Sequence, residues 1–530
     1  MPPGQKGADT PTAAGNSHGD IPGLFAVART DPSRIAIVEP DGPTVTFAAL
    51  AAKINRVSAG LLSLGLRRGD VVAGMLANSV EQFELTLATF QLGMYYVPLN
   101  TRLSPSDVEY IVHDSGAKVL VAHAEYARSL HPLAAALQCG RFVIGESTPE
   151  WRPYDELPGV DAAEPPSARF AGAVMGYTSG TTGRPKGVRR ALPDITPENS
   201  LALTFQFMGQ FGLQAGPGVH LVCSPLYHAA PAGFATTSLH LGHTLVLHER
   251  FDAEATLRDI ERYGVNSTHM VPTHFHRLLR LPPQVRDSYD VSSLDVVIHA
   301  GAPCPVEAKQ QMIAWFGPIV WEYLGSTEGS VSVITPAEWL AHPGSVGRPA
   351  SILLLGEDGE PVPTGAAGTI YFPSGPMAFS YHNNPEMTAA ARHGDFVTVG
   401  DIGKLDEDGY LYLLDRRSDL IISGGVNIYP AEIEQFFMSH PSVSDIAVVG
   451  VPDEEWGQSV LAVIQPTEDA AIDEELERSL SEFAIAGLAT HKRPRRYVIQ
   501  RSLPRTEAGK LLRRKVREAF VDQTNSVYGK

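Results

Sequence analysis

The spacing of apolar residues near the start of the chain predicts an amphipathic helix within residues 46–66. Apolar side chains recur there at steps of three and four, which is the repeat of one helix face. Thr46 precedes the pattern, and a threonine at that position accepts a hydrogen bond from the first helical turn. We therefore expect a helix that begins after Thr46 and buries one face. The apolar residues on that face are Phe47, Leu50, Ile54, Val57, Leu61 and Leu64.

Short apolar runs and helical patterns then alternate along the chain. A helical pattern occupies residues 80–93, and five apolar runs are typical of strands. Such alternation predicts α/β layers in which the sheets are mostly parallel. The expected strands are residues 71–76, 118–123, 219–224, 243–248 and 294–301.

The pattern changes near residue 345, and up to residue 417 short strands alternate with glycine, proline and Asp-Gly turns. These features predict a small β-rich subdomain. A compact unit of helices and strands follows, and 530 residues are too many for one hydrophobic core. We therefore predict a large N-terminal α/β domain at residues 21–417 and a small α+β C-terminal domain at residues 418–530. In the small domain we expect helices at 430–440 and from Asp473, and strands at 446–451 and 459–466.

Composition narrows the class of protein. The chain has 42 Lys and Arg against 59 Asp and Glu, a formal charge of −17, which argues against a nucleic-acid binder. The charge is uneven, because residues 491–517 carry eleven Lys or Arg and one acid, Glu507. Cys139, Cys223 and Cys304 are odd in number and widely spaced, so we expect neither a disulfide framework nor a cysteine metal site, and predict a reducing compartment.

The sequence gives no sign of a membrane or secretory protein. No apolar run approaches the ~20 residues of a membrane-spanning helix. Residues 1–20 lack the apolar core of a signal peptide and have the Gly, Pro and Thr content of a disordered tail. We therefore predict a cytoplasmic protein with no membrane span.

A stretch rich in glycines, hydroxyls and cations, GYTSGTTGRPKGVRR at residues 176–190, is a candidate phosphate-binding loop. It is not a Walker-type P-loop, since Pro185 and Gly187 flank the lysine and oppose an immediate helix. Two interpretations remain open, a surface loop without a ligand and a flexible loop around a polyphosphate. The groups that could contact phosphate belong to Thr178, Ser179, Gly180, Thr181, Thr182, Gly183 and Lys186.

Three further motifs favour the polyphosphate. EYLGSTEG at 322–329, TVGDIGKLDEDGYLYLLDRRSDLIISGGVNIYPAEIE at 398–434 and PRTEAGK at 504–510 follow TSGTTGRPKG in that order. Together the four resemble the core motifs of the adenylate-forming superfamily, which includes acyl-CoA synthetases, firefly luciferase and nonribosomal-peptide adenylation domains. The resemblance extends from about residue 25 to about residue 520, and ISGGVNIYPAEIE is most similar to the fatty acyl-CoA ligase branch.

The resemblance implies a two-step reaction that uses ATP, Mg²⁺ and coenzyme A. A carboxylate is joined to AMP with release of pyrophosphate, and the acyl group then passes to a thiol. The loop from Thr178 to Gly183 and Lys186 resembles the segment that binds the outer phosphates. Thr327 and Glu328 match the positions that contact the α-phosphate, and Glu328 matches the Mg²⁺ ligand, as suits a hard cation. Lys510 matches the lysine that reaches the carboxylate and the α-phosphate.

Other positions follow from the same resemblance. Asp401 matches the acid that binds the ribose hydroxyls, and Arg416 the arginine at the domain junction that binds ribose or phosphate. His228 matches a gate over the acyl tunnel, although a lone histidine there is also typical of a satisfied core residue. The positions that resemble the adenine-binding wall are Gly301, Ala302, Pro303, Tyr323, Leu324 and Gly325.

The second step implies that the small domain rotates about a hinge near Arg417. Gly424 and Gly425 then resemble the strand that lines the pantetheine tunnel, where close backbone approach suits glycine. The basic excess at 491–517 either binds CoA phosphates or forms a solvated face.

The sequence departs from the family at two positions. Leu324 replaces the tyrosine that usually packs on adenine, which could weaken ATP binding by ~0.5–1.5 kcal/mol. Ser418 replaces a hinge Lys or Asp, which could shift the balance between the two conformations. Neither change removes a catalytic group, so we predict the full reaction.

The acid is predicted to be apolar and to lack an amine. The stretches expected to form the pocket are 228–234, 271–279, 299–301 and 325–332, and their one acid is Glu328, which the metal requires. The sequence therefore predicts an acyl-CoA ligase for a fatty, aryl or bulky polycyclic or terpenoid acid, with a homodimer as a possible assembly. Three alternatives stay open: one half-reaction only, transfer to a carrier protein or amine, and a nucleotide-binding protein without catalysis.

Overall fold

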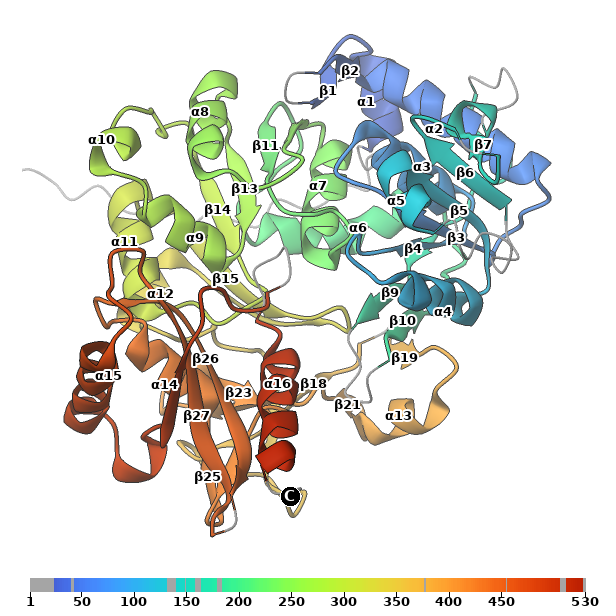
Figure 1. Cartoon of the computed structure of the whole chain (residues 1–530). Helices are drawn as coiled ribbons and strands as arrows, with labels where there is room; N and C mark the ends of the chain where they lie inside the picture. The colour runs from blue at the N-terminus through green and yellow to red at the C-terminus, as the bar shows by residue number, and fades with distance from the viewer. Residues whose placement is uncertain are drawn as a thin grey trace, which may run out of the picture.

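The computed structural model describes residues 23–39, 42–130, 140–147, 149–157, 164–178, 184–375, 378–453, 455–505 and 511–527. The predicted tail at residues 1–20 lies outside these ranges. Figure 1 shows a large α/β part, coloured blue to orange, with a smaller orange-red part against it. No helix in the described ranges is long and apolar enough to span a membrane.

A six-stranded sheet, parallel throughout, forms the first layer of the large part, in the order β7-β6-β5-β3-β4-β8. Its helices supply the crossovers that parallel strands require. The strands are β3 Val71–Met75, β4 Tyr95–Pro98, β5 Ala117–His123, β6 Gly140–Ile144, β7 Arg152–Pro153 and β8 Ala173–Val174. The helices are α2 Phe47–Ser63, α3 Val80–Gln91, α4 Pro105–Ser115 and α5 Ala124–Ser129, with a short 3₁₀ turn at Tyr154–Glu156.

An eight-stranded sheet forms the second layer, in the order β16-β15-β14-β13-β11-β12-β1-β2. Neighbours from β15 to β1 run parallel, and the edge strands β16 and β2 are antiparallel. Its strands are β1 Ile35–Val38, β2 Thr44–Thr46, β11 Val219–Val222, β12 Thr244–Leu247, β13 Ser267–Met270, β14 Val296–His299, β15 Val320–Gly325 and β16 Ser330–Ile334. Its helices are α1 Leu24–Thr30, α6 Pro197–Gly209, α7 Ala229–Leu241, α8 Ala253–Tyr263, α9 Pro272–Leu279, α10 Pro283–Arg286, α11 Val306–Phe316 and α12 Pro336–Ala341.

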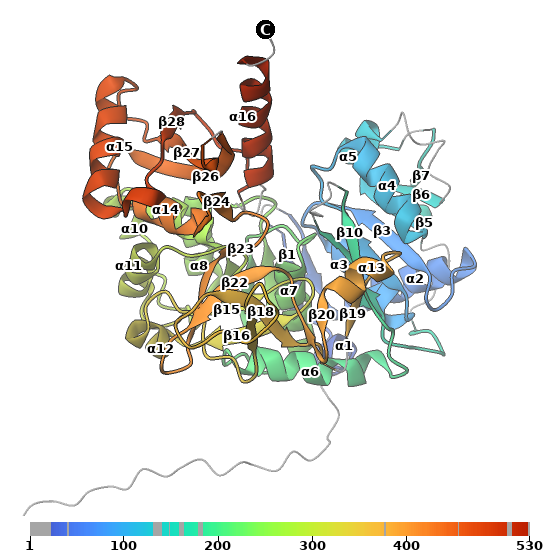
Figure 2. The same cartoon turned by 90° about the horizontal axis from the view of Figure 1, so that it is seen from below.

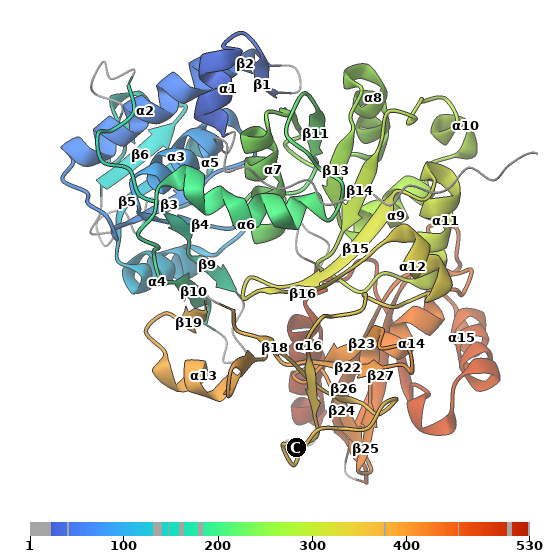
Figure 3. The ribbon, with the colours of Figure 1, turned by 180° about the vertical axis from the view of Figure 1, so that it is seen from behind.

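A shared core joins the two layers. Side chains of α2, α3 and α7 pack in one cluster with residues of both sheets, such as Tyr96 of β4 and Leu245 of β12. Figure 3 shows α6 lying across the back of the molecule. The predicted mixed α/β class with mostly parallel sheets is confirmed.

The predicted helix after Thr46 is present as α2. The Thr46 side chain accepts a hydrogen bond from Ala49 N at 3.2 Å, and the five apolar positions from Phe47 to Leu61 are buried. The prediction for Leu64 is wrong, because the helix ends at Ser63 and Leu64 is 41% exposed. Gly65 follows with φ of 84°, so the chain turns away before a further helical turn can form.

The rest of the large part consists of short antiparallel sheets. The strands β9 Gly176–Thr178, β10 Lys186–Arg190 and β19 Phe379–Tyr381 make one sheet. The other strands are β17 Leu353–Leu355, β18 Gly368–Pro373, β20 Arg392–His393, β21 Phe396–Val397, β22 Asp401–Leu405 and β23 Leu411–Arg416, with helix α13 Pro385–Ala390.

The small part has its own apolar clusters on the two faces of a three-stranded sheet. Figure 2 shows it at one edge of the large part, with α16 leading to the C-terminus. The domain boundary at residue 417 stays a prediction. The elements are β24 Ile421–Ser423, β25 Val426–Ile428, α14 Pro430–Phe437, β26 Val443–Asp453, β27 Gly457–Pro466, α15 Glu474–Gly487, a 3₁₀ turn Thr490–Lys492, β28 Arg496–Ile499 and α16 Arg513–Val527.

Buried histidines in and beside the second sheet predict acid sensitivity. Burial lowers the pKa of His220, His269 and His274 to about 3 and that of His240 to about 4. An unfolded histidine titrates near ~6.5, so the unfolded chain binds more protons as the pH falls below that value. Each such group lowers the free energy of unfolding by about 1.4 kcal/mol per pH unit.

We therefore expect the thermal midpoint to fall steadily between pH 7 and pH 4.5, measured by circular dichroism. Replacing His220 with asparagine should flatten this dependence, whereas replacing the exposed His393 should leave it unchanged. A midpoint that is constant over this range would contradict the assignment.

Candidate functional site

The two strands that flank the glycine-rich stretch form an antiparallel pair. Lys186 on β10 lies opposite Thr178 on β9. The Thr178 Oγ1 atom is buried and has no hydrogen-bond partner among the described residues, so it can serve a ligand. Residues 179–183, which include the predicted Ser179, Gly180, Thr181, Thr182 and Gly183, lie outside the described ranges.

The segment after β15 is fixed against these strands. Arg190 Nη2 donates to the carbonyl oxygens of Thr327 at 2.9 Å and Glu328 at 2.7 Å. A Cβ on Gly176 would lie 3.0 Å from the Thr327 methyl carbon, so glycine permits the close approach of β9. Thr327 and Glu328, 150 positions from β9 in the sequence, are thus beside the phosphate-loop strands.

Glu328 and Lys186 are close but not in direct hydrogen-bond contact. Their Oε1 and Nζ atoms are 3.7 Å apart, and the Glu328 side chain is only 6% exposed. Tyr381 contacts both: its hydroxyl donates to Glu328 Oε1 at 3.1 Å, and Lys186 Nζ is 4.0 Å from its ring centroid. Burial lowers the pKa of Lys186, while Glu328 opposes that shift.

Asp401 and Arg416 form a second charged pair nearby. They are register partners on β22 and β23, and Arg416 Nε is 3.0 Å from Asp401 Oδ1. Arg416 acts electrostatically on both Lys186 and Tyr381, which places the two pairs in one site. The arrangement offers acceptors for sugar hydroxyls beside cations for phosphate.

The segment Gly301, Ala302 and Pro303 directly follows β14, at the edge where β15 also ends. His299 and Glu322 are register partners on these parallel strands, so the 301–303 and 325–328 segments leave the sheet side by side. Gly301 has φ of 86°, which favours glycine at the start of this turn.

Leu324 and Tyr323 face opposite ways, because side chains alternate along a strand. Leu324 packs with apolar residues of the β17–β18 region, and Gly325 follows it. The Tyr323 ring is buried among Phe207, Phe211 and Phe234, and its hydroxyl is 3.5 Å from His269 Nε2. Tyr323 is therefore placed in the apolar core beside the predicted acid-pocket wall.

His228 stands immediately before α7, the helix that carries Phe234. Its ring contacts that of Tyr227, with centroids 4.6 Å apart. Phe234 in turn contacts the His269 ring at 4.9 Å. The wall that the sequence predicted from 228 to 234 thus rests on aromatic side chains.

Lys510 lies outside the described ranges, but both sides of its segment are fixed. Arg505 and Leu511 form an isolated antiparallel bridge, and Arg505 Nε is 2.6 Å from Asp445 Oδ2. Arg513 is paired with Glu434 and lies 3.1 Å from Asp419, next to the predicted hinge residue Ser418.

Gly424 and Gly425 form the turn between β24 and β25, with φ of 57° and 78°. Gly424 N donates to Trp456 O at 2.8 Å, and a Cβ on Gly424 would lie 2.6 Å from the Trp456 ring. Part of the basic excess is neutralised inside the small part: Lys492 pairs with Glu432, and Arg514 with Glu518.

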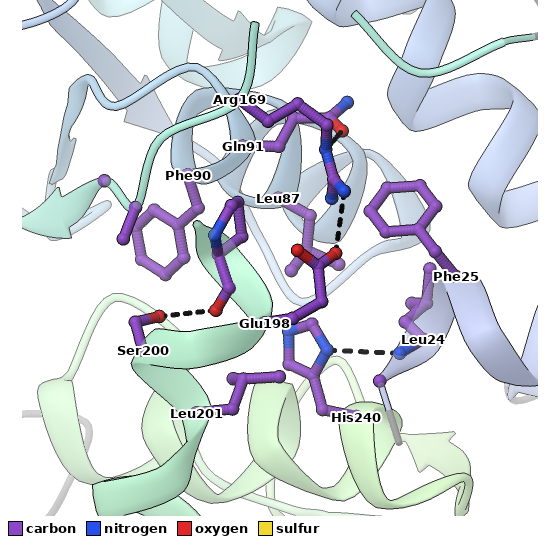
Figure 4. Close-up of a pocket in the computed structure, with 14 residues that line it drawn as sticks. Leu24, Phe25, Leu87, Phe90, Gln91, Arg169, Glu198, Ser200, Leu201 and His240 are labelled. Carbon is purple, nitrogen blue, oxygen red and sulfur yellow. Dashed lines mark hydrogen bonds and ion pairs between the residues drawn. The ribbon is translucent and has the colours of Figure 1, made fainter. Parts of the chain in front are cut away.

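A pocket lies away from this site. Figure 4 shows Arg169 paired with Glu198 at 2.7 Å and covered by Phe25, with Leu24 N donating to His240 Nδ1. None of the predicted site residues lines it. It belongs to the packing of α1, α3, α6 and α7.

Comparison with known proteins assigns this arrangement to a family. The protein family described as "AMP-binding enzyme" matches residues 24–382, and the family described as "AMP-binding enzyme C-terminal domain" matches residues 432–510. The chain belongs to the AMP-binding enzyme family.

Curated relatives of this AMP-binding enzyme are CoA ligases. A feruloyl-CoA synthase from Amycolatopsis sp. is 35% identical over 93% of this chain and 97% of its own length. The long-chain-fatty-acid–CoA ligase FadD13 of Mycobacterium tuberculosis is 32% identical over 93% of this chain and 97% of its own. The predictions of the adenylate-forming superfamily and of an ATP-dependent acyl-CoA ligase are confirmed.

Solved structures agree with this assignment. The o-succinylbenzoate CoA synthetase of Bacillus subtilis, in complex with its acyl-adenylate, has a TM-score of 0.78 and 31% identity, over 93% of this chain and 98% of that one. ATP-bound MatB from Rhodopseudomonas palustris has a TM-score of 0.81 and 29% identity, over 94% and 99%. The predicted use of ATP and AMP is thus supported at the level of the family.

Two residues of the site were not predicted from the sequence. Arg190 was part of the quoted stretch, yet only the fold shows it donating to the 327–328 backbone. Tyr381 lies in the stretch FSYHNNPE, which has no chemical signature of its own. An aromatic residue before the turn-forming Asn-Asn-Pro was the available signal.

Proposed function

We propose that this AMP-binding enzyme activates an aromatic carboxylic acid and transfers it to coenzyme A. The observation that supports it most is the joint arrangement of Lys186, Glu328, Asp401 and Arg416, which offers cations and acceptors for a nucleotide. In the first step an acid carboxylate oxygen attacks the α-phosphorus, and the bond to pyrophosphate breaks. In the second, the CoA sulfur attacks the acyl carbon, AMP leaves, and the thiol proton goes to solvent.

The proposed roles of the side chains follow their chemistry. Thr178 to Gly183 and Lys186 bind the outer phosphates, while Thr327 and Lys510 stabilise charge at the α-phosphate. Asp401 and Arg416 bind the ribose. The adenine lies along Gly301 to Pro303 and Leu324 to Gly325, and His228 with Gly424 and Gly425 borders the path of acyl group and thiol.

Magnesium fits the donors present. Glu328 is a buried carboxylate. Its Oε1 atom accepts a hydrogen bond from the Tyr381 hydroxyl, and the Lys186 ammonium lies 3.7 Å from the same oxygen. Mg²⁺ usually keeps several water ligands and binds substrate phosphates, so one such carboxylate from the protein is sufficient. Bound there, Mg²⁺ would supply positive charge to the triphosphate, and Glu328 would hold it.

The choice of an aromatic acid is supported by an aromatic cluster beside the stretches proposed to form the acid pocket. It is built from Phe207, Phe211, Phe234 and Tyr323, and His269 is neutral because burial lowers its pKa to about 3. A wall without fixed charge suits an apolar acyl group without an amine. Aromatic rings prefer edge contacts of this kind. The relatives named for feruloyl, succinylbenzoate and indoleacetate substrates are consistent with this choice.

The proposal also includes domain boundaries at residue 417, rotation of residues 418–530 about Ser418, a cytoplasmic location and a possible homodimer. The odd number and wide spacing of Cys139, Cys223 and Cys304 support the location. Light scattering on the purified protein determines the assembly.

The function is tested with a panel of cinnamic, benzoic, linear fatty, polycyclic and amino acids. Pyrophosphate and thioester are measured separately, with ATP and Mg²⁺, with and without CoA. We expect acid-dependent pyrophosphate with the aromatic acids, and thioester only when CoA is present. Preference for linear acids would overturn the aromatic assignment. Thioester that forms from supplied acyl-adenylate and CoA, but not from the free acid, would indicate a single half-reaction. An amide or carrier product would contradict CoA as acceptor.

A further inference from the structure

Two lysine–glutamate ion pairs, one fully buried and one partly buried, have different geometries. Lys309 Nζ and Glu322 Oε2 are in hydrogen-bond contact at 2.7 Å. Lys186 Nζ and Glu328 Oε1 are 3.7 Å apart, beyond the ~2.7–3.2 Å of such a bond. Since opposite charges of low exposure attract strongly, a separation of this size needs a structural cause.

The separation is explained by Tyr381, which is 4% exposed and contacts both charges. Its ring face lies 4.0 Å from the Lys186 ammonium, and its hydroxyl donates to Glu328 Oε1 at 3.1 Å. A phenol is protonated at neutral pH, so the Tyr381 hydroxyl is the donor in this hydrogen bond. Both contacts are made by one side chain.

Tyr381 is itself held firmly. It pairs with Val188 across β19 and β10, and its backbone N–H donates to Thr388 Oγ1 at 2.9 Å. The next residue, His382, is bound through Nε2 to the Asp114 carbonyl at 3.0 Å, at the end of α4. The backbone that carries the ring is therefore fixed by neighbours on β10, α13 and α4.

We propose that Tyr381 is a positioning residue for adenylation, which holds Lys186 through its ring and Glu328 through its hydroxyl and so keeps their ion pair at 3.7 Å, beyond hydrogen-bond contact. This inference rests on the proposed roles of Lys186 with phosphate and Glu328 with metal. A ring face attracts an ammonium without accepting a directional hydrogen bond, so the ammonium donors stay available. The hydroxyl occupies one lone pair of Glu328 and leaves the rest for a cation.

The two functions of the side chain can be separated by substitution. Tyr381→Phe keeps the ring beside Lys186 and removes the hydroxyl from Glu328. Tyr381→Met removes both contacts and keeps an apolar side chain. Tyr371→Phe on β18, whose ring contacts His393 outside the site, is the matched control.

Binding is measured without turnover. Isothermal titration gives ATP affinity in the absence of acid, and electron paramagnetic resonance of Mn²⁺, used as the probe metal, gives metal affinity in the presence of ATP. For Tyr381→Phe we expect about tenfold weaker Mn²⁺ binding, with ATP affinity at saturating metal within about threefold of wild type. For Tyr381→Met we expect a further loss of ATP affinity of about three- to tenfold.

Steady-state rates give a second test of the two contacts of Tyr381. The Mg²⁺ concentration for half-maximal pyrophosphate release should rise in Tyr381→Phe, while KM for ATP should rise only in Tyr381→Met. Wild-type metal dependence in Tyr381→Phe, or equal ATP affinity in Tyr381→Phe and Tyr381→Met, would overturn the proposal. Tyr381→Phe retains the packing, so it tests the hydroxyl contact even if Tyr381→Met does not fold. The Mn²⁺ and ATP titrations remain decisive if no acid in the panel is a substrate.

Discussion

Replacing Lys510 with alanine is expected to lower acid-dependent pyrophosphate release by about 10²–10³-fold. The proposed role of Lys510 is to contact the acid carboxylate and the α-phosphate in the transition state. Loss of one such group removes charge stabilisation that the substrates in their ground state do not need. The rate constant should therefore fall much more than the affinity for ATP.

The measurement is continuous pyrophosphate release with the preferred acid from the panel. Lys515→Ala, which removes an exposed cation on α16, is the matched control and should keep the wild-type rate. Thioester formation from supplied acyl-adenylate and CoA should survive in Lys510→Ala, since that step does not involve ATP. A rate within threefold of wild type in Lys510→Ala would contradict the role.

Replacing Lys309 with methionine is expected to lower the free energy of unfolding by about 3–5 kcal/mol. Lys309 on α11 is fully buried, with its Nζ 2.7 Å from Glu322 and 4.6 Å from the Trp339 ring. Burial raises the pKa of Glu322, but His299 and Lys309 beside the carboxylate bring it down to about 2. Without Lys309 the carboxylate would stay buried with one neutral histidine.

The double variant Lys309→Met and Glu322→Met is expected to be more stable than Lys309→Met alone, because apolar side chains replace both charges. Chemical denaturation followed by tryptophan fluorescence measures both, and Trp339 reports locally. Arg514→Met, at an ion pair that is about half exposed, should cost less than ~1 kcal/mol. Equal stabilities of the single and double variants would show that the buried pair contributes no specific interaction.

The spacing of apolar residues and the capping residues predicted where helices begin. The step of three and four after Thr46 gave α2, and the Thr46 hydroxyl caps it. Asp473 likewise accepts a hydrogen bond from Leu476 N at the start of α15. Helix ends were less certain, because they depend on where the chain turns to pack. The helix expected to reach residue 440 ends at Phe437, and Leu64 leaves the buried face of α2.

Motifs predicted candidate residues for the chemistry, but not how these residues meet. Lys186, Glu328, Asp401 and Arg416 were named from stretches spread over 230 positions, and the fold brings these four together. Tyr323, named with the adenine wall, instead packs among phenylalanines, because strand alternation turns its ring from the face of Leu324.

The sequence by itself determined the family, the α/β class and the chemical types of the site, since these depend on patterns and motifs that are local in the chain. The tertiary structure alone decided that Arg190 fixes the 327–328 backbone and that Tyr381 contacts both Lys186 and Glu328. Such contacts arise where strands distant in sequence become neighbours in a sheet. Their distances follow from packing, and no spacing along the chain encodes them.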